Sequence, residues 1–408
     1  MAVPLPPSLR TKLDLMFEGV RYTEPLARAA KGAFPNFFPH RVEPGDPDPT
    51  GTGRVPIPYM LITGDDVHCR IRTARDSPWR VDDAPGGGWV LRRGDDAVPV
   101  AFEPAWRWLA TRTSDGLPAL QAGLSLHADM AVVNVAPGCQ YFQAPRVDGV
   151  AMQCTFCTYG APDARIRALG QAMREEDVPE PAHRRLQEVL AAALAETPIT
   201  TIYLVGGSLT DPLAEGRRFV TLARRVQEVV GRRVPVTCGS GALPPESQRV
   251  LHGEGLVDAV SFNLEIWSEP LFRRLCPGKA RFVGYHRWIE WLEHAVTLWG
   301  RGRVYSAMVA GIELGGDFGL DPDRALALAL EGARALTDRG ILPIYSLYWP
   351  APGRELPAPI PVLRDWFERL HVEYHAIRRH AGLRIWEGFM SHRSAFMQVE
   401  CDFDRAFG

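Results

Sequence analysis

The feature that most constrains the fold is a regular alternation of apolar and amphipathic segments that begins near residue 128. The apolar segments predict six strands, at Met130–Val135, Thr201–Val205, Val234–Cys238, Val257–Phe262, Val304–Ala310 and Ile341–Leu347. The amphipathic segments predict helices at Ala182–Glu196, Glu215–Val230, Pro245–Gly255, Tyr285–Gly300 and Pro322–Gly340. Strands that alternate with helices form parallel sheets, so we expect an α/β fold, a partial or complete (β/α) TIM-like barrel of parallel strands.

Changes in composition predict three regions along the chain. Residues 1–127 are rich in proline, glycine and aspartate, with short strand segments at Tyr59–Thr63, His68–Thr73 and Trp89–Arg93. They predict an N-terminal region of strands and loops. The barrel is expected over residues 128–354. A C-terminal helical extension is expected over residues 355–408, with one amphipathic helix at Pro361–His380.

The composition argues against several classes of partner. The formal net charge of this 408-residue chain is only −2, so it has no basic excess to attract nucleic acid or an anionic membrane. No apolar run approaches the roughly 20 residues of a membrane-spanning helix, and the N-terminus does not resemble a signal peptide. We therefore expect a soluble cytoplasmic protein. Its seven cysteines are too few and too scattered for a disulfide scaffold.

Three of these cysteines follow the first predicted strand. Fourteen residues separate Cys139 from Cys154, and two separate Cys154 from Cys157. Thiolates are the usual ligands of iron–sulfur clusters, and three of them leave one iron of a four-iron cluster open to another ligand. The alternative is a structural zinc site, in which His127 or another cysteine would be the fourth ligand.

Small and polar residues follow the next four strands. They are Gly206, Gly207 and Ser208 after the second strand, Ser240 at the third, Asn263 and Glu265 at the fourth, and Gly311 and Glu313 at the fifth. Active sites of parallel α/β barrels lie at the carboxyl ends of the strands. These residues and the cysteines should therefore meet at one face of the barrel.

Together these motifs resemble those of the radical S-adenosylmethionine (SAM) superfamily, in its biotin-synthase-like and lipoyl-synthase-like form, over about residues 128–350. The usual cluster motif is C-x3-C-x2-C, and this chain departs from it by its longer first gap. The resemblance implies a [4Fe-4S] cluster on Cys139, Cys154 and Cys157, with SAM as the second cofactor. It also implies reductive cleavage of SAM to a 5′-deoxyadenosyl radical, which abstracts hydrogen from a small-molecule substrate. The near-neutral charge favours specialised metabolism over RNA modification.

The resemblance also implies which residues contact SAM. The backbone of Gly206 and Gly207 would meet the methionine amino group, with Ser208 in place of the glutamate of the family. Asn263 and Glu265 would hold the ribose. Further predicted SAM-binding positions, mostly around the adenine, are Phe156, Tyr159, Ser240, Ser306, Gly311, Glu313 and Tyr345.

Cys276 and Lys279 are the predicted catalytic residues, in a segment that we expect to join a helix to a loop. Lys279 is one of only three lysines, with Lys12 and Lys31. It would bind a carboxylate or phosphate of the substrate, or the SAM carboxylate; the alternative is a solvated loop lysine. Cys276 would donate hydrogen to a substrate radical, or is merely a buried thiol.

Two other functions remain open from the sequence. A sulfur-inserting radical SAM enzyme would need a second cluster, but Cys69, Cys238, Cys276 and Cys401 share no short spacing. A zinc-stabilised barrel that binds a partner without catalysis is the third possibility. The radical SAM function implied by the resemblance, cleavage of SAM followed by hydrogen abstraction, requires a low-potential electron donor such as flavodoxin or ferredoxin.

Overall fold

The computed structural model describes residues 4–36, 39–48, 50–136, 138–157, 178–315, 319–348, 364–390 and 398–408. The chain forms two compact units. One unit comprises residues 1–109 and 392–408, and the other comprises residues 110–391. The boundaries predicted at residues 127 and 354 stay predictions.

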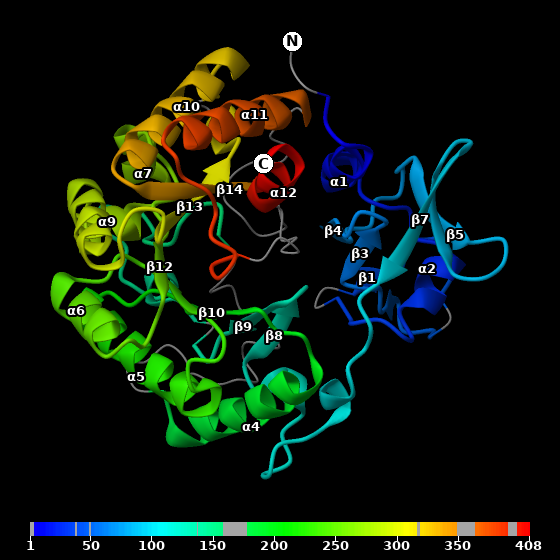
Figure 1. Ribbon diagram of the computed structural model, residues 1–408, viewed down its shortest axis with the longest axis horizontal. Coiled ribbons are helices and arrows are strands. Elements are labelled where there is room, and N and C mark those ends of the chain that lie inside the picture. The colour runs from blue at the N-terminus through cyan, green and yellow to red at the C-terminus, as the bar shows by residue number, and fades with distance from the viewer. Residues whose placement is uncertain are drawn as a thin grey trace. The chain divides into compact units, whose positions relative to one another are not determined.

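A seven-stranded sheet forms the centre of the larger unit (Figure 1). Its strands are β8 (Leu124–His127), β9 (Met130–Val133), β10 (Thr201–Val205), β11 (Val236–Ser240), β12 (Ala259–Phe262), β13 (Val304–Ala310) and β14 (Ile341–Leu347). They lie in the order β14-β13-β12-β11-β10-β9-β8, so the two outer strands are not paired and the barrel is partial. Strands β9 to β14 are parallel, which confirms the predicted α/β fold. The antiparallel strand β8 was not predicted.

Helices surround this sheet (Figure 1). They are α4 (Glu180–Glu196), α5 (Pro212–Val230), α6 (Pro245–Gly253), α7 (Glu269–Leu275), α8 (Pro277–Phe282), α9 (Tyr285–Trp299), α10 (Pro322–Asp338) and α11 (Arg364–His380). Helix α5 shows why they form where the sequence predicts them. The Asp211 side chain caps its first turn by accepting from the Leu213 N–H at 2.9 Å, and Gly231 ends it in the left-handed region.

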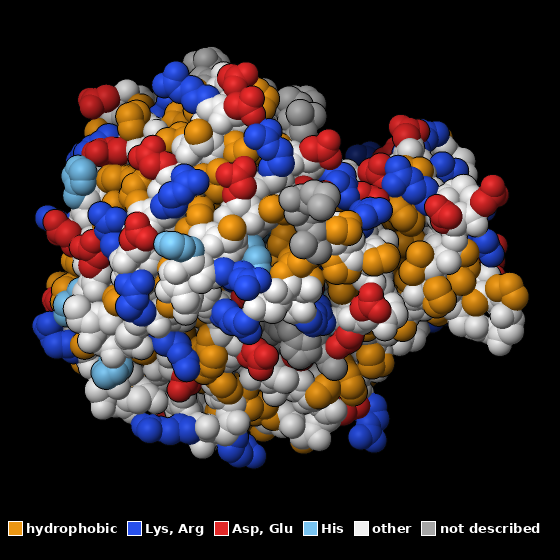
Figure 2. Space-filling view, turned by 45° about the horizontal axis from the view of Figure 1, so that its top comes forward, with side chains coloured by type: hydrophobic (Ala, Val, Ile, Leu, Met, Phe, Trp, Pro, Cys, Tyr) orange, Lys and Arg blue, Asp and Glu red, His pale blue; other side chains and the backbone are white. Residues whose placement is uncertain are grey.

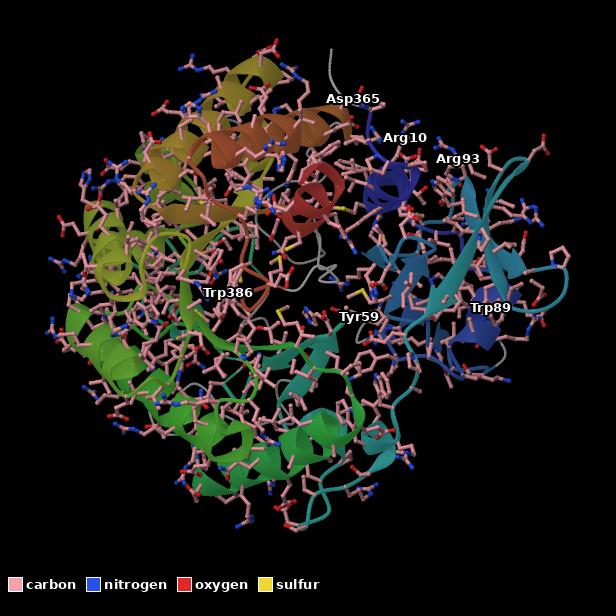
Figure 3. All side chains as sticks on the ribbon, in the orientation of Figure 1. Arg10, Tyr59, Trp89, Arg93, Asp365 and Trp386 are labelled. Atoms are coloured by element: carbon pink, nitrogen blue, oxygen red, sulfur yellow. The ribbon has the colours of Figure 1, made fainter. Side chains whose placement is uncertain are left out.

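Residues after α11 close the amino-terminal end of the strands. The Phe389 ring stacks on Tyr305 of β13, with the ring centroids 3.6 Å apart. Thr201, the first residue of β10, donates from its hydroxyl to the Gly388 carbonyl at 2.7 Å. Trp386, labelled in Figure 3, donates from its backbone to the Tyr305 hydroxyl at 3.2 Å. Aromatic packing therefore fills this end of the barrel.

The smaller unit is built around a five-stranded antiparallel sheet in the order β4-β3-β7-β6-β5. Its strands are β3 (Met60–Thr63), β4 (His68–Arg70), β5 (Trp79–Asp83), β6 (Trp89–Arg93) and β7 (Asp96–Phe102), beside the short pair β1 (His40–Arg41) and β2 (Arg54–Val55). The helices described in this unit are α1 (Pro7–Glu18), α2 (Glu24–Ala29) and α12 (Glu400–Phe407). Lys12 of α1 and Asp402 of α12 form a buried ion pair 2.5 Å long.

The charged side chains on the surface are of both signs, as the near-neutral net charge predicts. Figure 2 shows basic and acidic side chains interspersed over the face that it presents, in keeping with the net charge of −2. Among the described helices, none is long and apolar enough to cross a bilayer.

Candidate functional site

Cys139, Cys154 and Cys157 lie close together beside the carboxyl ends of β9 and β10. Burial, together with the neighbouring Cys154 and Cys157, raises the pKa of Cys139 to about 12. The backbone N–H groups of Tyr141 and Ser208 point at the Cys139 sulfur and partly oppose that shift. The Cys157 N–H donates to the Cys154 carbonyl at 3.0 Å, which closes a tight turn.

The long first gap is a surface excursion that returns to its starting point. Val147 and Val150 exchange two backbone hydrogen bonds, of 3.1 and 2.9 Å, across a turn in which Asp148 and Gly149 both have positive φ. Two positive φ angles are characteristic of a type I′ hairpin turn. Before the turn, Tyr141 stacks on Phe282 of α8 with the centroids 5.4 Å apart. The loop is anchored at its base, so its length does not separate the cysteines.

The glycine pair after β10 permits close contact with the first cysteine. A Cβ on Gly207 would stand 1.9 Å from the Gly138 carbonyl oxygen, so no other residue fits there without moving the backbone. The Gly207 N–H donates to Ala136 O at 2.9 Å, and the Gln140 N–H donates to Ser208 O at the same distance. The predicted SAM-binding segment therefore lies directly against the Cys139 backbone.

Two charged residues of α5 support this arrangement, and the sequence did not single them out. Glu215 is buried and accepts from the Leu209 N–H at 2.9 Å and from the Gly241 N–H at 2.8 Å. Burial raises the pKa of Glu215, and the charge of Arg218 opposes this. Arg218 is also buried and donates to the Gly207 carbonyl. In an amphipathic pattern both residues look like ordinary solvent-facing positions, so periodicity alone could not reveal them.

Asn263 and Glu265 follow β12, as predicted, and pair with β13. The Asn263 side-chain oxygen accepts from the Ala307 N–H at 3.2 Å. The Glu265 N–H donates to Ala307 O at 2.9 Å, and the Val309 N–H donates to Glu265 O at 2.8 Å. Glu265 has a φ of +72°, a left-handed conformation that is uncommon outside glycine. Residues in such conformations cluster at functional sites.

Lys279 is neither in a loop nor solvated, which corrects the sequence analysis. It lies in α8 and pairs with the Glu265 carboxylate at 2.8 Å. Its ammonium group also donates to the Asn263 carbonyl at 2.5 Å and lies 4.7 Å from the centre of the Trp288 ring. Burial lowers the pKa of Lys279, but the Glu265 carboxylate, with the neighbouring Cys154 and Cys276, outweighs this effect, so the pKa lies above the usual lysine value.

The junction between α7 and α8 holds Cys154, the second of the three predicted cluster ligands, in place. The Thr155 N–H donates to Leu275 O and the Gly278 N–H to Met152 O, both at 2.9 Å. These two bonds flank Cys154 and Cys276. The hydrogen bond with Cys276 raises the pKa of Cys154 well above its ordinary value, and burial adds to this shift. Cys276, a predicted catalytic residue, is thus fully buried against a predicted cluster ligand.

Three predicted SAM-binding side chains make other contacts. The Tyr345 hydroxyl donates to Ala329 O of α10 at 2.8 Å and its ring packs on α11, so this side chain lies in the helical layer. The Ser306 hydroxyl accepts from the Leu264 N–H at 2.9 Å. The Ser240 hydroxyl donates to the adjacent Gly241 carbonyl at 2.8 Å. Phe156 is buried, and Tyr159 lies outside the described residues.

Glu313 follows β13 in the short 3-10 helix Ile312–Leu314, after Gly311 turns the chain with a φ of +87°. It is buried, and its Oε2 atom has no hydrogen-bond partner among the described residues. Burial raises the pKa of Glu313 to about 7. Glu313 is therefore a second unusual carboxyl at this end of the sheet.

The donor set at the three cysteines fits an iron–sulfur cluster. Backbone N–H groups directed at a ligand sulfur are among the features that tune such clusters. No three His, Cys, Asp or Glu side chains in the described ranges are arranged to hold a single metal ion. A cluster differs because each thiolate binds a different iron, so its ligands do not converge on one point.

Comparisons with known proteins give remote likenesses, two of which follow, and no protein-family model matches the chain. Bacteriochlorophyllide c C-7(1)-hydroxylase from Chlorobaculum limnaeum is 23% identical over 333 residues, which cover 78% of this chain and 77% of that protein. The crystal structure of a radical SAM methyltransferase from Sphaerobacter thermophilus is 19% identical, with a TM-score of 0.41. That match covers 79% of this chain and 81% of the methyltransferase.

Proposed function

We propose that the protein is a radical SAM enzyme with one [4Fe-4S] cluster on Cys139, Cys154 and Cys157. The observation that carries the proposal is that these three cysteines lie close together beside Gly207, at the carboxyl ends of the strands. They do so although fourteen residues separate Cys139 from Cys154. The remote similarity to a hydroxylase supports an enzymatic role. Cys139, Cys154 and Cys157 would hold the cluster, which would supply the electron for reductive cleavage of SAM to a 5′-deoxyadenosyl radical that abstracts hydrogen from the substrate.

In this proposal the residues of the chain hold the two cofactors in place. Gly207 lets the segment after β10 approach Cys139 closely, so backbone atoms can reach a ligand at the open iron. Asn263 and Glu265 bind the SAM ribose, because a carboxylate can accept from both hydroxyl groups. Glu215 and Arg218 secure the loops after β10 and β11 and exclude water from behind them.

The substrate in this proposal is a small molecule with an unactivated carbon. The Chlorobaculum relative is named for hydroxylating a bacteriochlorophyllide, which is a small molecule. The mixed charges of the surface also favour a small substrate over nucleic acid. A soluble low-potential protein, such as flavodoxin or ferredoxin, would deliver the electron.

Anaerobic reconstitution with iron and sulfide, followed by dithionite and SAM, tests the proposal. We expect about four irons per chain and release of 5′-deoxyadenosine that depends on Cys139, Cys154 and Cys157. About eight irons would favour the sulfur-inserting alternative. About one zinc and no iron would favour the zinc-stabilised barrel and overturn the proposal.

A further inference from the structure

The ion pair between Lys279 and Glu265 links α8 to the segment after β12, and α8 packs against the loop that carries the three cysteines (residues 139–157, the cysteine loop). Its Nζ–Oε1 distance is 2.8 Å, and the side chains are only 8% and 18% exposed. The Lys279 ammonium group also donates to the Asn263 carbonyl and faces the Trp288 ring. Protein groups therefore surround the ammonium group, which leaves it poorly placed to bind a substrate carboxylate directly.

The carboxylate of this pair has a different environment. Glu265 binds Lys279 through Oε1, and 18% of its side chain is exposed, so this side chain is not sealed off from a ligand. The left-handed backbone of Glu265 costs about 1 kcal/mol or more and persists only where the surroundings hold it. Lys279 binds both the Glu265 side chain and the carbonyl of Asn263, which makes it part of those surroundings.

Helix α8 joins this pair to the cysteines. Gly278, next to Lys279, packs so closely that a Cβ there would stand 2.4 Å from the Met152 carbonyl oxygen. Two residues after Met152, Cys154 lies against Cys276 at the start of the same helix. A displacement of α8 would therefore disturb the cysteine loop and Glu265 together.

We infer that Lys279 is a positioning residue: it holds Glu265 and Asn263 so that they present the Glu265 carboxylate to the ribose of SAM. The inference rests on the proposed function and replaces the predicted direct contact of Lys279 with a substrate. It requires a lysine because one compact ammonium group makes both contacts beside the Trp288 ring. The planar fork of arginine has a different geometry.

SAM affinity, measured by equilibrium dialysis on the reconstituted protein, tests this role. We expect K279M to weaken SAM binding roughly 100-fold, because Glu265 and the Asn263 carbonyl lose the ammonium group that holds both of them in place. K279R should recover about tenfold of that loss, since it restores the charge but not the geometry. K31M, at the exposed Lys31, is the matched control and should leave the affinity unchanged.

A double-mutant cycle separates positioning from direct contact with SAM. If Lys279 acts through Glu265, E265Q/K279M should bind SAM about tenfold more tightly than K279M, because the unpaired charge is gone. Losses that simply add would overturn the inference in favour of direct contact. Iron content and thermal unfolding of the double variant show that it is folded and loaded. A wild-type protein that holds four irons but binds no SAM would refute the proposed function itself, whereas K279M with wild-type affinity would refute only this inference.

Discussion

Two of the three lysines of this chain are buried in ion pairs, one in each unit, and the pairs differ in their surroundings. Lys12 and Asp402 join α1 to α12 across 390 residues of sequence, and their side chains are 0% and 2% exposed. Asp402 also accepts from Arg405 at 2.7 Å, so both of its oxygens have partners. The Lys279–Glu265 pair instead leaves its carboxylate partly exposed, on a residue with a left-handed backbone.

In the proposed function, the two pairs have different purposes. A sealed and fully hydrogen-bonded pair can fix the docking of two helices, but it has no capacity for a ligand. A pair with an accessible oxygen at the carboxyl ends of parallel strands can do both. Burial of a charge alone therefore does not mark a functional site. Our proposal for Glu265 rests instead on its partly exposed side chain and its left-handed backbone.

The largest expected effect concerns Cys154, a predicted cluster ligand that lies near Lys279 of the second pair. Cys154→Ala should abolish cluster assembly and SAM cleavage, because two thiolates cannot replace three, while the barrel stays folded. Iron and sulfide analysis with circular dichroism checks this. Cys69→Ala, at a buried thiol in the other unit, is the control and should retain full iron. Full iron in the Cys154 variant would show that the ligand assignment is wrong.

The next effect tests whether the first pair is purely structural. Lys12→Met should lower the free energy of unfolding by about 3 kcal/mol, because it leaves the Asp402 carboxylate buried without the ammonium group, and the remaining pair with Arg405 is partly exposed. Denaturant unfolding measures this loss. The affinity of the folded variant for SAM should equal that of the wild type. A large change in SAM affinity would remove the distinction between the two pairs.

Glu313 sharpens the comparison because it is a buried carboxyl without a lysine partner in the described structure. Its pKa rises from 4.5 to about 7 on folding, so the folded state holds the proton more tightly. The resulting stabilisation is complete below about pH 4.5 and is lost as the pH rises through 7, a change of about 3 kcal/mol. Glu313→Gln should remove this dependence, which unfolding between pH 5 and 8 would reveal. If the free energy of unfolding of the wild type and of the variant changed with pH in the same way, this role of Glu313 would be wrong.

The smallest expected effect concerns the accessible carboxylate. Glu265→Gln should weaken SAM binding about tenfold, because it exchanges charged hydrogen bonds to the ribose for neutral ones. Cluster content should not change, because Glu265 is not a ligand. Equilibrium dialysis with SAM measures the affinity, with Glu254→Gln on the exposed surface as a matched control. Equal affinities would reject the ribose role.

The sequence predicted most of the barrel because strand patterns are local. Strands β10, β13 and β14 have the bounds that the apolar runs indicated, and the turn residues predicted most helix ends within a few positions. Helix α1 and strands β5 and β7 of the smaller unit were missed. Their segments lack a clear period among many turn-forming residues, and their pairing depends on contacts distant in sequence.

The sequence by itself determined the parallel sheet, the kinds of residue at its carboxyl edge and the set of cysteines, since each depends on short-range spacing. Only the tertiary structure decided which of those side chains meet. It directs Tyr345 into the helical layer, buries Glu215 beneath the loops and pairs Lys279 with Glu265 rather than with solvent. Residue spacing specifies the direction of a side chain within one element, whereas its partner depends on how separate elements pack.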